Sequence, residues 1–552
     1  MKQSLLLTLL FIVSATSIAT TAVAAPGCLL ASFATPGPAP TGLAFDGESL
    51  WLADRLTDTL YAIDPESGAV RRELPAPGFM PRGLTWDGKY LWCVDGEEGR
   101  IVQLDVTSGL TLKSLESPTE QPQGITWDGA NLWLADAGED VLCQISPDDG
   151  TVIERFAAPL GNPTGLTWWE GYLWCADRRA DKIFLVDPRH RGEVVFGVDA
   201  PGLHANGLAC DGKRLWNADY QDDAIHCLVL DDGETIQTTD PHRLHLALIQ
   251  EFRNYGPGEV TQLDLYLAIP RERPGQTFLG EVTFDPAPTA ILEDRWQQPV
   301  AHFRLAELPL AERQRVTMTV DVELSAWQQF VFPHRVGSLD DIPKDVRQAY
   351  LVDEDKYRIH DPRIQQAVQQ ALGGERNPYW MMRNIHRYIR ERMYYELSGG
   401  WNVAPRVIER GNGSCSEYTF VFIAMCRAAG IPARYVGAVV IRGDEASYDD
   451  VFHRWSQVYL PSYGWVHVDP QGGDRETPAE VAESIGNLSN RFLITTEGGG
   501  ASEYLGWGYN HGESWIARGP VKVHMEAVGE WSPLAESTAP VTAPAASGAC
   551  AE

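Results

Sequence analysis

The sequence predicts a multidomain protein in which an all-β propeller, with five blades as the preferred number, is followed by a β-sandwich and then by an α+β domain. Three observations lead to this prediction: a regularly repeated segment in the first part of the chain, alternation of apolar and polar residues in the middle, and helical periodicity from about Lys344. A chain of 552 residues is also too long for one hydrophobic core, so several domains are expected.

The N-terminal segment 1–24 predicts a secretory signal peptide. Lys2 supplies a positive charge, Leu5–Val13 forms an apolar core, and the small residues "AVA" at 22–24 fit a cleavage site. Polar residues interrupt the apolar run before it reaches the ~20 residues of a membrane span, and no later segment predicts one. We therefore expect a secreted or periplasmic protein. Cys28 follows closely, but Pro26 and Gly27 before it do not fit a lipidation site, so lipoprotein anchoring is not expected.

The composition limits the kinds of partner and the state of the cysteines. The net charge is −30, from 45 Lys and Arg against 75 Asp and Glu, which disfavours nucleic acid or anionic lipid as a partner. The charges are spread along the chain and predict a solvated surface. In an exported protein the nine cysteines are expected to lie in an oxidising compartment, where disulfides form. Because their number is odd, at least one thiol has no intramolecular partner.

Five related segments fill residues 28–236: "GLAFDGESLWLAD", "GLTWDGKYLWCVD", "GITWDGANLWLAD", "GLTWWEGYLWCAD" and "GLACDGKRLWNAD". Each unit predicts a strand, usually an Asp-Gly turn and a second strand, and two more strands follow. Four strands in a period of about 40 residues are typical of a β-propeller blade. The repeated residues are Gly42, Gly83, Gly124, Gly165 and Gly207, and Trp51, Trp92, Trp133, Trp174 and Trp216; the position of the glycine rises by 41 three times and then by 42.

The segment "CLLASFATPGPAPTGL" resembles the fourth strand of a unit without the other three. We expect it to complete the last blade and close a ring of five blades, with six as the alternative. The repeated Trp and Asp are interpreted as structural, with Trp filling the space between blades and Asp holding turns. One face of the propeller can bind a protein ligand, but the sequence does not identify one.

Cysteines in the blade strands have two open interpretations. Cys93 with Cys143, and Cys175 with Cys227, can form disulfides between blades, or all four can be buried thiols.

Residues 241–340 alternate in hydropathy, as in "VTMTVDVEL", and predict the β-sandwich, without a catalytic constellation. Residues 532–552 are rich in Pro, Ala and Ser and predict a disordered tail, whose Cys550 can pair with Cys28, pair with another chain or stay free.

Residues 344–515 predict the α+β domain, and its chemistry begins at Cys415. The stretch "GNGSCSEYTFVFIAMCRAAGIPARYV" predicts a helix that begins at Cys415 and stops before Gly430 and Pro432. The positive end of the helix dipole favours a thiolate, so Cys415 is the candidate nucleophile. Cys426 lies eleven positions on, ~16 Å along the helix, too far for a disulfide to Cys415, and is expected to be inert packing.

A thiolate nucleophile needs a base and a group that orients the base. The stretch "DVFHRWSQVYLPSYGWVHVDPQGG" predicts a hairpin that contains His453 and Asp469. If Leu460 pairs with Trp465, His453 lies ~10 Å along the strand from Asp469; a turn centred on Pro461 places the two opposite each other, and a bulge closes part of the gap. His467 is the rival base, although its spacing from Asp469 on one strand suits a hydrogen bond poorly.

The two stretches "GSCSEYTFVFIAMCRAAGIPARYVGA" and "HRWSQVYLPSYGWVHVDP" resemble the core of the transglutaminase-like superfamily over about residues 375–475. The resemblance implies a papain-like, transglutaminase-like fold with Cys415, His453 and Asp469 as the catalytic triad. It also implies an oxyanion site made by the backbone N–H of the nucleophile and an upstream side chain. Tyr395 and Trp401 are the candidates for that side chain, and packing roles for both stay open. Arg454 stands where many relatives have a small residue, which can affect access.

The resemblance implies a cysteine enzyme that acts on peptide or side-chain amides of a protein or peptide substrate through a thioester, and the signal peptide predicts that this enzyme is exported. Hydrolysis, as in a protease or deamidase, is slightly favoured over transfer to an amine, because water is abundant outside the cell. This chemistry needs no cofactor, and no Cys/His spacing indicates a metal site. The alternatives are a non-catalytic envelope scaffold that binds through the propeller and an envelope structural protein.

Overall fold

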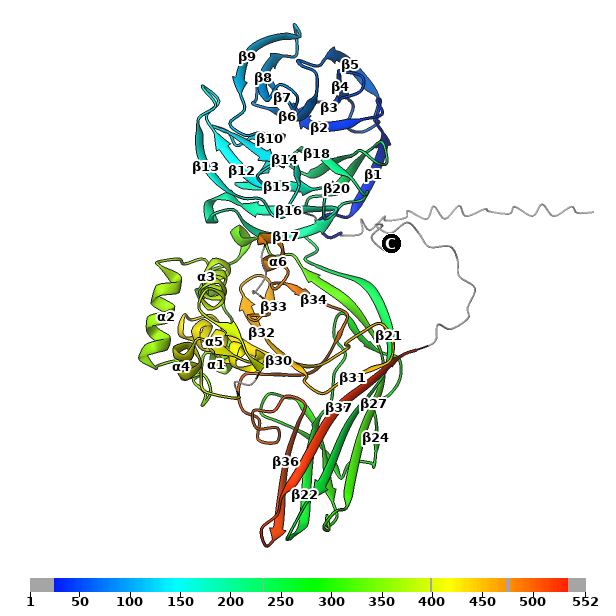
Figure 1. The fold of residues 1–552 in the computed structure, drawn as a ribbon, viewed down its shortest axis with the longest axis vertical. Helices are drawn as coiled ribbons and strands as arrows, with labels where there is room; N and C mark the ends of the chain where they lie inside the picture. The colour runs from blue at the N-terminus through cyan, green and yellow to red at the C-terminus, as the bar shows by residue number, and fades with distance from the viewer. Residues whose placement is uncertain (1–23, 232, 398–399, 473–476, 535–552) are drawn as a thin grey trace, which may run out of the picture.

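The computed structural model describes residues 24–231, 233–397, 400–472 and 477–534. The propeller lies at one end of the molecule, the α+β domain in the middle and the long strands of the sandwich at the other end (Figure 1). The predicted signal peptide therefore lies outside the described residues except for Ala24, as do Cys550 and most of the predicted tail. Within the described ranges, no helix is both long and apolar enough to cross a membrane.

The propeller has five blades of four antiparallel strands, as the repeat predicts. The first strand of the chain pairs with β20 and completes the fifth blade, so the ring closes as expected. The inner strands lie around the centre and the fourth strands around the rim (Figure 1). The strands are β2 (Pro40–Phe45), β3 (Leu50–Asp54), β4 (Thr59–Ile63) and β5 (Val70–Pro75); β6 (Pro81–Trp86), β7 (Leu91–Asp95), β8 (Arg100–Asp105) and β9 (Leu110–Glu116); β10 (Pro122–Trp127), β11 (Leu132–Asp136), β12 (Val141–Ile145) and β13 (Val152–Ala157); β14 (Pro163–Trp169), β15 (Tyr172–Asp177), β16 (Lys182–Asp187) and β17 (Glu193–Asp199); β18 (Ala205–Cys210), β19 (Arg214–Asp219), β20 (Ala224–Val229) and β1 (Leu29–Ala34).

The repeated tryptophans and aspartates form one recurring contact. The indole N–H of Trp51 donates to the carboxylate of Asp46, in the Asp-Gly turn, at 2.8 Å. The corresponding pairs in three other blades are Trp92–Asp87, Trp133–Asp128 and Trp216–Asp211. In the fourth blade the turn residue is Trp169, and the indole nitrogen of Trp174 has no partner among the described residues. The repeated Trp and Asp residues therefore stabilise the turn within a blade, which agrees with their structural interpretation.

The propeller cysteines are thiols. Cys93, Cys143, Cys175, Cys210 and Cys227 are all free, so the disulfide alternative for the two blade pairs is wrong. Burial raises the pKa of Cys93 to about 12 and that of Cys143 to about 11, because a thiolate is poorly solvated between blades. Cys28 is disulfide-bonded, which leaves no thiol there for lipid attachment.

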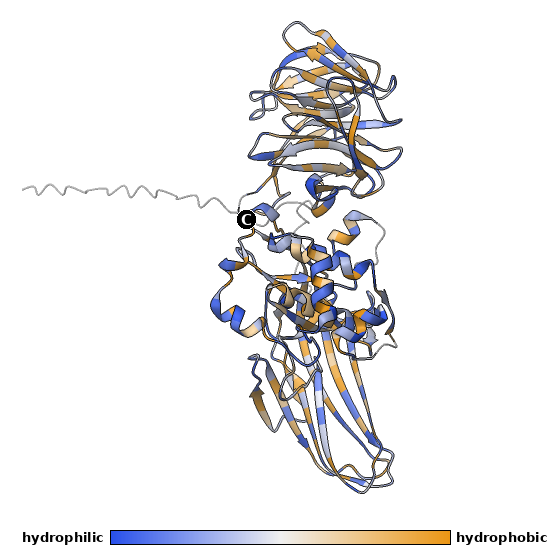
Figure 2. Ribbon diagram, turned by 90° about the vertical axis from the view of Figure 1, so that its left-hand side faces the viewer, coloured by the Kyte–Doolittle hydropathy of each residue, from blue (hydrophilic) through white to orange (hydrophobic). Residues whose placement is uncertain are grey.

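The sandwich consists of two sheets, and it is discontinuous in sequence. One sheet has the order β23-β27-β21-β37-β31, with β24 and β34 also on β27, and the other has the order β25-β26-β22-β36. Alternate residues are apolar along the long strands (Figure 2). The strands are β21 (Ile236–Asn254), β22 (Glu259–Ala268), β23 (Gln276–Phe278), β24 (Thr283–Asp285), β25 (Ala290–Glu293), β26 (Pro299–Leu305), β27 (Arg313–Gln329), β31 (Ser447–Asp449), β34 (Asn487–Leu488), β36 (His511–Arg518) and β37 (Val523–Pro533).

The C-terminal strands differ from the predicted boundaries. β36 pairs with β22 and β37 pairs with β21, so residues 511–533 belong to sheets that begin in the 241–340 segment. The α+β domain, predicted at 344–515, thus stands as an insertion in the sandwich. Ser532 and Pro533 lie in β37 rather than in the predicted tail of 532–552. Their partners on β21 lie far earlier in the chain, before the whole α+β domain, so no local pattern marked them.

The α+β domain packs helices against a four-stranded sheet of order β33-β32-β30-β35. Helix α5 lies against β32 in the middle of the domain. The helices are α1 (Lys344–Tyr350), α2 (Pro362–Leu372), α3 (Pro378–Arg390), α4 (Ala404–Arg410), α5 (Cys415–Ala428) and α6 (Pro478–Ala482), with 3₁₀ helices η1 (Pro188–His190), η2 (Pro333–Arg335) and η3 (Leu339–Asp341) in the chain. The strands are β28 (Tyr394–Tyr395), β29 (Asn412–Gly413), β30 (Ala433–Val440), β32 (His453–Leu460), β33 (Gly464–Val468) and β35 (Phe492–Gly498).

Blade 4 of the propeller docks on the α+β domain. Glu193 of β17 accepts hydrogen bonds from Arg383, whose Nε lies at 3.0 Å, and from Arg387, both on α3. The ring of His190 in η1 stacks on Trp380 with 3.8 Å between centroids. Both contacts come from the outer hairpin of one blade, so the two domains meet at the rim of the propeller and leave its two faces uncovered by this contact.

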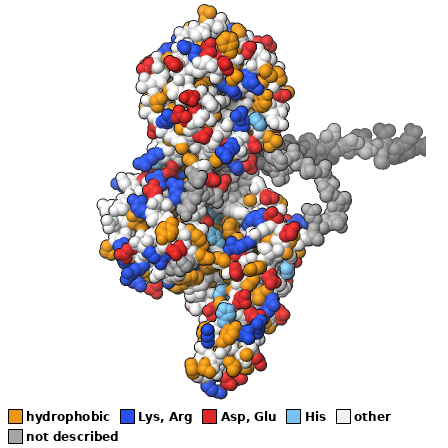
Figure 3. All heavy atoms as spheres, in the orientation of Figure 1, with side chains coloured by type: hydrophobic (Ala, Val, Ile, Leu, Met, Phe, Trp, Pro, Cys, Tyr) orange, Lys and Arg blue, Asp and Glu red, His pale blue; other side chains and the backbone are white. Residues whose placement is uncertain are grey.

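Charged side chains of both signs are interspersed over the face in Figure 3. Opposite charges also meet in exposed pairs such as Arg243–Glu323 and Lys182–Asp199. Exposed pairs of this kind contribute ~0–1 kcal/mol each, so the surface charge supports solubility more than stability. This agrees with the solvated surface that the composition predicts.

The glycine that opens each repeat is expected to be indispensable, because neighbouring inner strands approach it closely. A Cβ added at Gly124 would lie 2.1 Å from the carbonyl oxygen of Thr164. We expect Gly124→Ala to destabilise the propeller by about 1–3 kcal/mol or more, seen as a lower midpoint of thermal unfolding by circular dichroism. Gly280→Ala is the control, since a Cβ there meets nothing within 4 Å. Equal midpoints for both variants would contradict this account of the repeat.

Candidate active site

Cys415 is the first residue of α5, as the sequence predicts. Ser414 is the N-cap, and its backbone N–H donates to the carboxylate of Glu417 at 3.2 Å, which fixes the start of the helix. The sequence predicts one apolar face, but the structure buries nearly every residue of α5, the polar ones included. A helix enclosed on all sides holds its first residue rigidly, and the side chain of Cys415 is only 6% exposed.

The structure brings the three predicted site residues together. The Nε2 atom of His453 lies 2.9 Å from Oδ2 of Asp469. The same ring interacts with Cys415 closely enough to lower the pKa of the thiol and to have its own pKa raised by the sulfur. The backbone N–H of Arg454, the next residue along β32, also donates to the sulfur. The ring of His453 therefore interacts with both the carboxylate of Asp469 and the sulfur of Cys415.

The hairpin reaches this geometry in a register between the two considered from sequence. Leu460 pairs with Gly464, and continuing the ladder would set His453 opposite Gln471. The chain instead leaves β33 after Val468, and the backbone N–H of Asp469 donates to the carbonyl of Ser484 at 2.8 Å. The backbone N–H groups of Gln471 and Gly472 then donate to Oδ1 of Asp469, at 3.0 and 3.3 Å. This turn, rather than strand pairing, aims the carboxylate at His453.

The environment favours a charged thiolate–imidazolium pair. Burial on its own raises the pKa of a thiol, but the hydrogen bond and charge of His453 offset it, so the pKa of Cys415 lies below its ordinary value. Burial likewise lowers the pKa of His453, but the carboxylate of Asp469 and then the thiolate outweigh it and raise that pKa well above the ordinary value. The pKa of Asp469 is lowered, because the charge of His453 outweighs the effect of burial.

His467, the rival base, is excluded by its surroundings. Its Nδ1 accepts the indole N–H of Trp455 at 2.9 Å, and its Nε2 contacts the amide of Gln457 at 3.0 Å. Burial lowers the pKa of His467 to about 3, so the ring stays neutral and enclosed. It packs behind the site and does not reach Cys415 as a base.

Arg454 lies under the nucleophile in a cage of aromatic rings. Its guanidinium carbon is 4.3 Å from the centroid of Tyr509 and 4.8 Å from those of Trp401 and Tyr435, and Phe420 adds a fourth ring at 5.3 Å. The side chain is fully buried and points away from His453, because successive strand residues face opposite sides. Arg454 therefore supplies positive charge beneath the sulfur and does not narrow access to it. Sequence reasoning missed this cage and Tyr509.

The two oxyanion candidates occupy different places. Tyr395 pairs with Gly413 across the short β28–β29 ladder, just before Cys415, and its side chain is 38% exposed. Burial and then the charge of Cys415 raise the pKa of Tyr395. Trp401 instead stacks on Tyr509 and contributes to the Arg454 cage. The structure thus favours Tyr395 over Trp401 as a donor near the reacting atoms.

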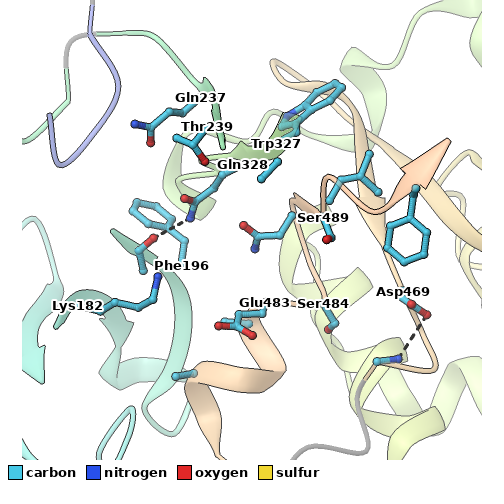
Figure 4. A pocket seen from close by; sticks show the side chains of 18 of the residues that line it. Lys182, Phe196, Gln237, Thr239, Trp327, Gln328, Asp469, Glu483, Ser484 and Ser489 are labelled. Atoms are coloured by element: carbon cyan, nitrogen blue, oxygen red, sulfur yellow. Dashed lines mark hydrogen bonds between the residues drawn. The ribbon is translucent and has the colours of Figure 1, made fainter. Parts of the chain in front are cut away.

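The active-site cavity, of about 420 Å³, opens beside His453 and Asp469, and Cys415 is not among its lining residues. Phe196 and Lys182 of propeller blade 4 form one wall, and Asp469 and Ser484 lie on the opposite side (Figure 4). Gln237 and Gln328 of the sandwich complete it. All three domains therefore line the space next to the candidate site, with amide, hydroxyl, charged and aromatic groups. In the described ranges, no group of three or more His, Cys, Asp or Glu is placed to hold a metal ion.

A buried thiolate beside an imidazolium at a helix N-terminus is suited to attack on a carbonyl carbon, and so to acyl transfer. Residues 365–470 match the family model of the transglutaminase-like superfamily, so the chain contains a transglutaminase-like domain. This match supports a cysteine enzyme.

The chain is also similar to individual proteins. It is 28% identical over 156 residues to an uncharacterized protein of Haemophilus influenzae, covering 23% of this chain and 42% of the relative, so less than half of that relative is spanned. Among solved structures, a candidate cysteine protease from Cytophaga hutchinsonii is 13% identical with a TM-score of 0.38, over 54% of this chain and all of that one. Glutaminyl cyclase of Myxococcus xanthus is 18% identical with a TM-score of 0.34, over 37% of this chain and 97% of that one.

The lowered pKa of Cys415 predicts alkylation in mildly acidic solution. We expect iodoacetamide to label Cys415 at about pH 6, where ordinary thiols react slowly, and labelling to fall only as pH drops through the lowered pKa. Cys426, whose pKa burial raises, should stay unlabelled. Because Cys426 is also less exposed, the decisive comparison is His453→Gln, which should move the pH profile of Cys415 upward. An unchanged profile would show that the ring does not stabilise the thiolate.

Arg454→Met tests the caged guanidinium. The substitution keeps an unbranched side chain as far as the position of Nε and removes the guanidinium charge, which contributes to the lowered pKa of Cys415. We expect the alkylation profile to move to higher pH, by less than in His453→Gln, with a change in stability within about 2 kcal/mol. Arg427→Met is the control: Arg427 is also buried, at the far end of α5, and donates to the carbonyls of Ala433 and Gly499. Arg427→Met should lower the midpoint of thermal unfolding and leave the pH profile of Cys415 alkylation unchanged.

Proposed function

We propose that the protein is an exported cysteine enzyme that acts on amides of protein or peptide substrates through a thioester on Cys415, with hydrolysis favoured over transfer to an amine. The observation that carries the proposal is the ring of His453, held 2.9 Å from the carboxylate of Asp469 and near enough to Cys415 to lower the pKa of its thiol. The transglutaminase-like domain supports the same class of chemistry.

In this mechanism the Cys415 thiolate attacks the amide carbonyl carbon, and the C–N bond then breaks as His453 gives its proton to the leaving amine. A thioester remains on Cys415. Water attacks it next, His453 takes the proton, and the acid leaves while the thiolate is restored. Asp469 keeps the ring oriented and compensates its positive charge throughout.

The oxyanion needs two donors. The backbone N–H of Cys415 is one, since the first residue of a helix has no intrahelical acceptor. The phenol of Tyr395 is our choice for the other, because the charge of Cys415 reaches it and it lies on the ladder next to Gly413. Trp401 is committed to the Arg454 cage.

The cavity favours water as the acyl acceptor. Its walls carry Ser484, Gln237, Gln328 and Glu483, which hold water well, beside apolar residues such as Leu488 and Ala482. Since propeller blade 4 forms one wall, we propose that the propeller contacts the substrate directly.

A binding role of the propeller is the second candidate function. Leu56, Phe79 and Leu203 are 62%, 73% and 63% exposed and come from loops at the same face of the propeller. Comparably exposed apolar side chains lie on the rim, where Leu110 and Ile153 are 65% and 54% exposed, so we propose a protein ligand for this face from its loops alone. This role is compatible with catalysis, or replaces it if Cys415 proves dispensable.

The proposal is tested by comparing the peptides of an envelope extract treated with the purified wild type, Cys415→Ala or Cys426→Ala. We expect new cleaved or deamidated peptides with the wild type and Cys426→Ala, and a loss of at least about 10³-fold in their rate with Cys415→Ala. A labelled primary amine added in parallel should be incorporated poorly. Dominant amine incorporation would establish transfer instead of hydrolysis, and identical peptide profiles for all three proteins would leave only the binding role.

A further inference from the structure

A second cavity, of about 230 Å³, lies between propeller blade 4 and helix α3. Helix α6 stands between it and the active-site cavity: Val481 lines the second cavity, whereas Ala479 and Ala482 line the first. The second cavity contains neither Cys415 nor His453, and the proposed reaction does not use it.

The charged lining of this cavity is one-sided. Arg191 comes from the propeller and Arg383, Arg387 and Arg390 come from α3, against a single carboxylate, Glu193. Four arginines and one carboxylate leave three positive charges in excess among the described lining residues. The excess stands out in a chain with a net charge of −30.

Glu193 is fully used by two of these arginines. Its carboxylate forms ion pairs with Arg383, whose Nη2 lies 2.8 Å from Oε2, and with Arg387. Arg191 and Arg390 form no ion pair with any residue that the structure describes. Arg390 nevertheless belongs to the site, because it lines the cavity together with His386. Arg191, which is exposed, and Arg390, which is half-buried, therefore line one cavity without an ion-pair partner among the described residues.

The propeller presents Arg191 through a change in its repeat. The outer hairpin of blade 1 runs from Asp64 to Gly68, whereas that of blade 4 runs from Asp187 to Gly192 and is longer by a single position. This insertion accounts for the single spacing of 42 in the repeat. Arg191 adopts a left-handed backbone with φ of 60°, which is unfavourable for a residue other than glycine. The longer hairpin thus places an arginine at the cavity at a local backbone cost.

His386 connects the cavity to the active site. Its Nε2 lies 3.4 Å from the backbone oxygen of Asp469 and 3.3 Å from Oγ of Ser484. Ser484 in turn accepts the backbone N–H of Asp469 through its carbonyl. Burial lowers the pKa of His386 to about 4, so the ring is neutral and the positive charge of the cavity comes from its arginines.

We propose that this cavity binds a small oligoanion that carries phosphate or carboxylate groups. Guanidinium groups form paired, charge-assisted hydrogen bonds with both kinds of group, and converging arginines are the usual way to bind them. Arg191 and Arg390 reach the anion from opposite domains, so its binding ties blade 4 to α3. Through His386 it also steadies the turn that aims Asp469.

The test is titration calorimetry of the full-length protein with pyrophosphate and, in a separate arm, with citrate. We expect at least one of them to bind the wild type and to raise its thermal midpoint. The double variant Arg191→Gln/Arg390→Gln should bind at least 10-fold more weakly, while Arg518→Gln, at an exposed arginine on β36, should bind as the wild type does. Binding of pyrophosphate alone identifies a phosphate ligand, and binding of citrate alone a carboxylate ligand.

The proposal is overturned if neither anion binds, or if the double variant binds as tightly as the wild type. Without anion, the double variant should unfold at the same or a higher temperature than the wild type, since it removes unpaired like charges. A lower midpoint would mean that the two arginines have structural partners, and would also overturn the proposal. If the double variant does not fold, Arg390→Gln alone replaces it in the test. This single variant is expected to bind the anion at least 3-fold more weakly than the wild type does. None of these measurements depends on catalysis.

Discussion

The imidazole of His453, held between a carboxylate and a sulfur atom, is the contact on which the candidate site depends. A thiolate as enclosed as that of Cys415 would be costly alone, and it is tolerable because a positive ring lies against it. The ring is in turn stabilised by Asp469. The charge of each group therefore depends on the other two. The three groups titrate together, so an observed pKa describes all three and not one residue. The enclosed helix α5 and the turn after β33 exist, in functional terms, to keep these three groups in line.

The propeller takes part in the site and is not a separate attachment. Blade 4 supplies Phe196 and Lys182 to the active-site cavity and Glu193 to the ion pairs with α3. The same blade carries the lengthened hairpin with His190 and Arg191. A change in the orientation of the propeller would thus alter both cavities at once. The remaining blades make no comparable contact with α3 in the described parts of the chain and are free to carry a partner.

Features set by local signals could be predicted, and features set by distant contacts could not. The blade repeat, the start of α5 at Cys415 and the presence of a hairpin with His453 and Asp469 follow from turn residues, a capping residue and spacing. The register could not be fixed, because the turn sequence fits several, and Asp469 is aimed by bonds to Ser484 and to the residues after it. The rings around Arg454 come from four separate segments, and β37 joins a strand far away in sequence. One overlooked signal was present: the single spacing of 42 marks the blade that docks on α3.

The discontinuous sandwich has a consequence for how the chain folds. The propeller is continuous from β1 to β20 and can close as soon as its own residues are available. The sandwich cannot, because β36 and β37 are made last and must find β22 and β21 across the whole α+β domain. Such distant pairing is slow. A chain truncated or cleaved before β37 would therefore keep a closed propeller. It would expose the unpaired edge of β21, where another chain can pair and cause aggregation.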